Sequence, residues 1–150
     1  MTQDLPAYAY VPGQTLRHAE GSFDPLQVTA RPGMSVEQLS RCAAWHAGLT
    51  YLEAGFHWEA HELMEPVWMA LPEGSDERRL VQMMIQLANA SLKARMERPR
   101  AVLRLCDSLE GVVVGLPDDV FQRFGVSRSE VFSRVERLVE WANRDVNYAK

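Results

Sequence analysis

The sequence predicts an all-α fold, a single-domain bundle of about five helices preceded by an irregular N-terminal arm. From residue 35 onward apolar residues recur at helical spacing, and no segment keeps the alternation of a β-strand over a useful length. The connections between periodic segments are short, which favours antiparallel neighbouring helices. Residues 1–34 hold four of the eight prolines and show no sustained period. We therefore expect an arm at residues 1–34 and a helical bundle domain at residues 35–150.

Length and composition place the chain among ordinary globular domains. With 150 residues it can bury a core without disulfides, and 47% hydrophobic with 24% charged residues is typical of soluble proteins. A net charge of −4 makes general nucleic-acid binding an unfavourable hypothesis. There is no uninterrupted apolar stretch of membrane-spanning length and no signal-peptide pattern, so we expect no membrane association and a cytoplasmic location. Cys42 and Cys106 are expected as buried free thiols.

Helix-end signals delimit the first two predicted helices. Ser35 and Gln38 have the spacing of a capping box and begin a helix that runs to about residue 54. Gly55 follows and is suited to a helix C-terminus, because glycine accepts a positive φ. The second helix carries the histidines at 57 and 61 and ends near residues 71–74.

Three further helices complete the predicted bundle. One begins after Ser75 and ends at about Glu97, and the next begins at Pro99, a residue favoured in the first turn, and ends at about Gly115. A short helical turn is expected over residues 120–124. Ser127 and Glu130 form another capping-box spacing, which begins a final helix that runs to about Ala149.

The arm is too apolar for a free tail. Its apolar residues include Tyr8, Tyr10, Val11, Leu16, Phe23 and Leu26. We expect it to lie on its own domain, with a neighbouring subunit as the alternative. Four tryptophans, seven methionines and this arm exceed what one small core hides comfortably, which favours a homo-oligomer.

The second helix carries the most informative pattern of the chain. Residues three and four apart share a helix face, and one such stripe consists of His57, His61, Met64 and Trp68. We expect this stripe to face the core, with Glu65 at its edge. Glu59 and Glu62 fall on the opposite side, which we expect to face solvent.

Buried polar side chains need partners, and the protein itself can supply them. Glu65 can hold His61 in one tautomer, while Gln82 or Gln86 bonds across the helix pair. This structural interpretation predicts a non-enzymatic binding or scaffold module with a buried His/Glu/Gln cluster.

A metal site is the principal alternative. Imidazoles four residues apart beside carboxylates can bind a divalent transition metal such as zinc. His61 with His57 or Glu65 would then bind the ion and His46 would complete the site, as in a metal-dependent hydrolase. Glu65, if not a ligand, is the candidate catalytic residue, as general base. His57 and Glu65 are too far apart for one ion, at about 12 Å along the helix. Metal-free acid–base or small-molecule chemistry is a third interpretation of the same cluster.

A second feature is a run of cations after the third predicted helix. Its members are Lys93, Arg95, Arg98, Arg100 and Arg104. They suit phosphate or RNA binding through this basic patch. They also suit a solvated helix C-terminus, where cations are favoured in any case.

Two motifs resemble those of a known family. The first is Glu59-Ala60-His61-Glu62-x-x-Glu65-x-x-Trp68. The second is Leu80-Val81-Gln82-x-x-Ile85-Gln86-Leu87-Ala88, followed by Pro99-Arg100-Ala101. Together they are similar to the signature of the domain-of-unknown-function family 309, over about residues 45–110.

The resemblance implies a small all-helical protein without an established biochemical activity. Carried over, it places His61, Glu62, Glu65, Trp68, Gln82 and Gln86 at the family's motif positions. Glu97 and Ala101 stand where the resemblance would place glycine, a departure confined to the loop between two helices.

Overall fold

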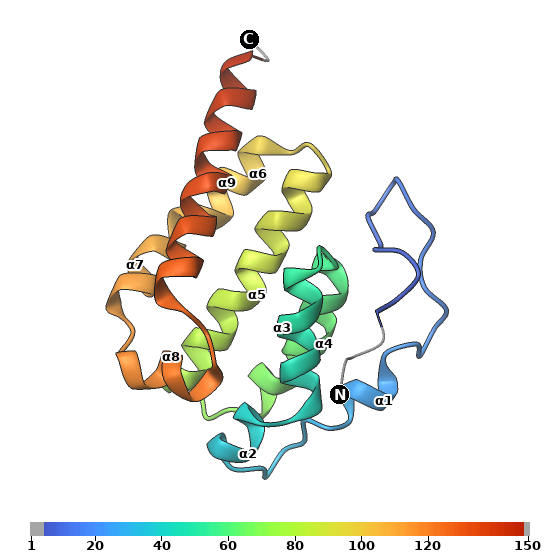
Figure 1. Cartoon of the computed structure of the whole chain (residues 1–150), viewed down its shortest axis with the longest axis vertical. Coiled ribbons are helices and arrows are strands. Elements are labelled where there is room, and N and C mark those ends of the chain that lie inside the picture. The colour runs from blue at the N-terminus through green and yellow to red at the C-terminus, as the bar shows by residue number, and fades with distance from the viewer. Residues whose placement is uncertain (1–4, 149–150) are drawn as a thin grey trace.

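The computed structural model describes residues 5–148, and every regular element within them is a helix (Figure 1). The all-α class is confirmed, but there are more helices than the expected five. The elements are α1 (Asp24–Gln27), α2 (Val36–Ser40), α3 (Ala43–Glu53), α4 (His57–Ala70), α5 (Asp76–Arg95), α6 (Pro99–Asp107), α7 (Leu109–Gly115), α8 (Asp118–Phe124) and α9 (Arg128–Tyr148). The expected helix end at Ala149 and the first four residues of the arm lie outside the described part of the chain.

The long helix α5 is the centre of the bundle. It packs against α4, α6, α7 and α9, while α3 packs against α4 (Figure 1). Within residues 5–148, no helix combines the length and apolar character needed to cross a membrane.

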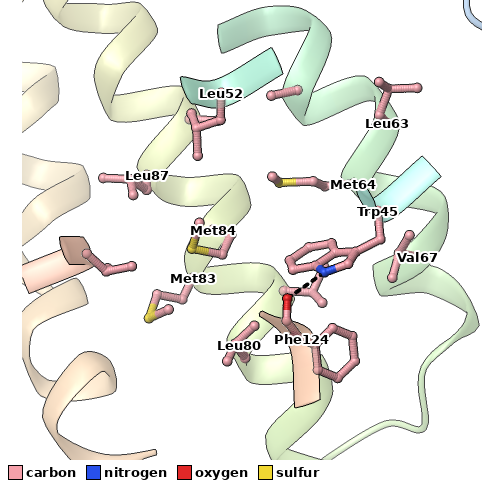
Figure 2. Close-up of a cluster of buried hydrophobic side chains, with 14 of the residues drawn as sticks. Trp45, Leu52, Leu63, Met64, Val67, Leu80, Met83, Met84, Leu87 and Phe124 are labelled. Carbon is pink, nitrogen blue, oxygen red and sulfur yellow. Dashed lines mark hydrogen bonds between the residues drawn. The ribbon is translucent and has the colours of Figure 1, made fainter. Parts of the chain in front are cut away.

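The core joins segments that are far apart in the sequence (Figure 2). Trp45 on α3 is fully buried, and its indole Nε1 donates a hydrogen bond of 2.9 Å to the carbonyl oxygen of Phe124. The two rings meet edge to face at 5.4 Å. An aromatic pair of this geometry contributes about 1 kcal/mol beyond the area it buries. This contact ties α3 to the end of α8.

The predicted helix over residues 35–54 is two helices, because Cys42 takes an extended conformation between them (φ −72°, ψ 155°). The capping box of Ser35 and Gln38 is formed at the start of α2. The first turn of α3 is capped instead by Thr29 of the arm, whose hydroxyl oxygen accepts a 2.9 Å hydrogen bond from the amide of Ala44. Thr29 lies fifteen residues before Ala44, so the sequence next to α3 does not indicate this cap. The division into α2 and α3 is therefore not predictable from the local pattern.

The predicted helix from Pro99 to Gly115 is also two helices. Ser108 ends α6 and begins α7, and α7 turns to pack against α5 and α9. The short helix expected near residues 120–124 is present as α8. At the start of α9 the hydroxyl of Ser127 accepts a 3.3 Å hydrogen bond from the amide of Glu130, as its spacing predicts.

Gly48 sets how closely α3 and α4 approach. A Cβ atom at this position would lie 3.0 Å from Cγ of Met64, which is tighter than ordinary van der Waals contact. The α3–α4 pair therefore packs through a residue that has no side chain.

Helices α3 and α5 end in the same hydrogen-bonded motif but with different residues at its left-handed position. After α3, Gly55 has φ 89°, and Phe56 bonds back to Tyr51. After α5, Glu97 has φ 58°, and Arg98 bonds back to Lys93 in the same pattern. An L-residue is strained in this region whereas glycine is not. Glu97 is the one non-glycine residue with a positive φ among residues 5–148.

Replacing Glu97 with Gly is therefore expected to raise the free energy of unfolding by about 0.5–1 kcal/mol. The exposed side chain of Glu97 has no ion pair that the substitution would remove, among the pairs that the described residues form. Urea denaturation measures the change. Gly55→Ala is the reverse control and should destabilise by a similar amount. A Glu97→Gly variant that is less stable than the parent would contradict the assignment.

Candidate functional site

Helix α4 carries the first motif. One of its faces packs into the core, one lies at the surface, and one is covered by the arm. Its core face consists of Ala60, Leu63, Met64 and Val67, all with no exposed surface. Of the expected inward stripe, only Met64 is therefore fully buried. His57, His61 and Trp68 are half-buried at the edges of this face.

The side chains of His61 and Glu65 contact each other at the surface. The imidazole Nε2 lies 3.1 Å from the carboxylate oxygen, and the two side chains are 28% and 48% exposed. The expected contact between these residues is present, but it is open to solvent. Exposed pairs of this kind add about 0–1 kcal/mol to stability.

Trp68 and Arg78 form the second contact on this side of α4. The guanidinium carbon lies 4.1 Å from the ring centroid, and Nε of Arg78 donates a 3.1 Å hydrogen bond to the carbonyl oxygen of Trp68. The indole Nε1 of Trp68 is buried without a hydrogen-bond partner. The stacked cation therefore fixes the ring while its one donor stays unused.

The two motif glutamines of α5 do not bond across the helix pair as expected. Gln82 is exposed and Gln86 half-buried, and neither side chain has a hydrogen-bond partner within the described part of the chain. Helices α4 and α5 form an antiparallel hairpin in which Trp68 lies beside Arg78. One turn back along α4 from Trp68 is Glu65, and one turn forward along α5 from Arg78 is Gln82, so these two residues lie at the same level of the hairpin. We call the surface formed by His61, Glu65, Trp68, Arg78, Gln82 and Gln86 the α4–α5 face.

The predicted metal ligands are not brought together. His46 lies exposed on α3, and His61 and Glu65 form a two-donor pair at the surface. Across residues 5–148, no three His, Cys, Asp or Glu side chains are arranged to hold one metal ion.

Glu59, expected at the solvent-facing side of α4, is fully buried, and that expectation is wrong. Its side chain has no exposed surface because the arm covers this face of the helix. One carboxylate oxygen, Oε2, accepts a 2.7 Å hydrogen bond from the amide of Tyr10 and lies 2.6 Å from Nε2 of His18. The other, Oε1, is buried without a partner.

Aromatic rings enclose this buried pair. The ring of Tyr8 stacks on His18 at 4.8 Å, and Phe23 meets His18 edge-on at 5.2 Å. Trp58 contacts the rings of Tyr10 and Phe23. The arm thus lies on α4 of its own chain, held by one carboxylate within an aromatic shell. The aromatic content of the arm indicated that it packs; nothing in the sequence indicated Glu59 as its anchor.

His57 lies at the opposite edge of α4. Its Nδ1 is buried without a partner. Burial, and then the nearby guanidinium groups of Arg134 and Arg95, lower the pKa of His57 from 6.5 to about 4. The imidazole is therefore neutral at physiological pH.

The basic patch and Glu62 lie outside the α4–α5 face. Lys93 is half-buried and the four arginines of the patch are exposed, and none forms an ion pair in residues 5–148. Glu62 lies half-buried on the side of α4 that faces the arm, where Gln27 donates a 3.0 Å hydrogen bond to its carbonyl oxygen.

The fold and the motif positions define a small helical bundle whose motif residues are divided between a surface face and an arm-covered face. Residues 45–105 match the family described as "Domain of unknown function (DUF309)". The match covers both motifs and supports the resemblance inferred from them. No curated protein and no solved structure matches the chain.

Removing His18 is expected to destabilise the fold strongly, because it leaves a buried carboxylate with one donor. His18→Ala should lower the free energy of unfolding by about 3 kcal/mol. Glu65→Gln, which removes the exposed pair on the same helix, should cost under about 1 kcal/mol. Urea denaturation compares the two variants. Equal and small losses would show that Glu59 is not the anchor of the arm.

His57 gives a pH dependence whose sign is fixed by its lowered pKa. Between about pH 6.5 and pH 4 the unfolded chain takes up a proton that folded His57 does not. The free energy of unfolding should therefore fall as pH is lowered through this window. His57→Gln should reduce that slope, whereas His46→Gln, at an exposed site, should leave it unchanged. An NMR titration that gives His57 a pKa near 6.5 would contradict the expectation.

Proposed function

We propose that this protein is a non-catalytic binding module that contacts a partner protein through its α4–α5 face. One observation carries the proposal. The two motif glutamines of this face, Gln82 and Gln86, reach the surface and have no hydrogen-bond partners in residues 5–148. Groups that the fold leaves unpaired remain available to a partner.

The composition of the face supports a protein as the partner. Trp, Arg and Met are enriched where proteins meet, and Trp68 stacked on Arg78 supplies a fixed aromatic anchor. Met69, the residue after Trp68 on α4, is 65% exposed. A second copy of the chain is one partner of this class, as the expectation of a homo-oligomer requires.

The metal-dependent hydrolase has weaker support. The His61–Glu65 pair offers two donors, and His46, the predicted third ligand, is exposed on α3. Structural zinc sites take four protein ligands and catalytic sites take three.

Photo-crosslinking from Gln82 tests the proposal. A photoreactive amino acid placed at position 82 in the native cells should capture a defined protein. The same group at Gln122, an exposed glutamine on α8, serves as the matched control and should not. Capture at 82 should disappear when Glu65 and Gln86 are both changed to Ala.

The stability of that double variant separates binding from architecture. Because Glu65 is exposed and the half-buried Gln86 has no hydrogen-bond partner in the described part of the chain, its free energy of unfolding should stay within about 1 kcal/mol of the parent. A loss of several kcal/mol would assign these residues to the fold. Identical capture from positions 82 and 122 would remove the α4–α5 face as a binding surface.

A further inference from the structure

A cavity of about 490 Å³ lies between the arm and α4. The arm contributes Arg17, His18, Phe23 and Asp24 to its walls, and α4 contributes Trp58 and Glu62. Its volume falls within the range of small-molecule sites, about 300–1,000 Å³. The site is built from two segments that the sequence places far apart.

The walls of this cavity carry an excess of negative charge. Three carboxylates line it, those of Glu20, Asp24 and Glu62, and Arg17 is the single guanidinium among its lining residues. Behind His18 lies the fully buried Glu59, which has one oxygen without a partner. A cation entering the cavity would therefore meet a favourable potential.

Aromatic surface lies beside these carboxylates. Trp58 and Phe23 both line the cavity, and their rings meet edge to face at 6.1 Å. The face of a tryptophan ring attracts cations, and does so more strongly where water is partly excluded. Aromatic walls next to carboxylates are the combination that recognises organic ammonium and guanidinium groups.

We propose that this cavity binds a small organic cation, an alkylammonium or guanidinium compound. Glu62 and Asp24 neutralise its charge, and Trp58 supplies the aromatic wall. The proposal stands apart from the α4–α5 face, since it uses none of the residues that define that face.

Binding should also stabilise the arm on the bundle. Because His18, Phe23 and Asp24 belong to the arm and Trp58 and Glu62 to α4, a bound cation contacts both segments. A ligand that binds only the assembled site raises the unfolding midpoint as its concentration rises.

Calorimetric titration of the full chain with agmatine and with butylammonium tests the proposal. Butanol and butyrate serve as the neutral and anionic counterparts of butylammonium. We expect both cations to bind at least tenfold more tightly than either counterpart. Added salt should weaken binding of the cations, because it screens the carboxylates.

Charge-neutral variants locate the site. Glu62→Gln combined with Asp24→Asn should weaken agmatine binding about tenfold, from the loss of two partly exposed charge contacts. Glu65→Gln removes a carboxylate from the same helix outside the cavity and should leave the affinity unchanged. Both variants retain the His18–Glu59 contact and should fold.

Three results would overturn the proposal. The first is no heat of binding and no rise in the unfolding midpoint with about 10 mM agmatine. The second is a neutral counterpart that binds as tightly as butylammonium. The third is an equal loss of affinity in Glu65→Gln and in the double variant.

Discussion

Glu59 is a carboxylate with no exposed surface, and the arm supplies the amide and the imidazole that bond to its Oε2. A buried carboxylate is costly unless it is paired, so the burial of Glu59 under the arm depends on the amide of Tyr10 and the imidazole of His18 that the arm brings to it. The aromatic contacts of Tyr8, Phe23 and Trp58 and the cavity beside them all depend on that placement. The arm also places Thr29 at the first turn of α3, where its hydroxyl oxygen accepts a hydrogen bond from the amide of Ala44.

The three faces of helix α4 therefore lie in three different environments. One face packs into the core, a second is covered by the arm, and the third stays at the surface beside α5. This division separates residues that the motif places next to one another: His61 and Glu65 reach the surface, whereas Glu62 turns towards the arm. A single helix thus serves two candidate binding regions with different chemistry, one for a protein partner and one for an organic cation.

The bundle itself was largely predictable, because the signals that define it are local. Capping-box spacings at Ser35 and Ser127, and Gly55 after α3, mark helix ends through hydrogen bonds within a few residues. The family motifs identified the right helices, and the match over residues 45–105 agrees with them. The thiols of Cys42 and Cys106 are buried and free, as their wide spacing predicts.

The sequence by itself determined the all-helical class, the main helix boundaries and the pairing of His61 with Glu65, since each depends on residues at most four apart on one helix or at its end. Only the tertiary structure decided which face of α4 is buried. A helical period predicts one apolar face and assigns the other to solvent. The helical period cannot indicate that an irregular arm covers the polar face and brings His18 into contact with Glu59, 41 residues further along the chain. For the same reason the expected glutamine bonds across α4 and α5 did not form: their formation depends on helix register, which packing sets.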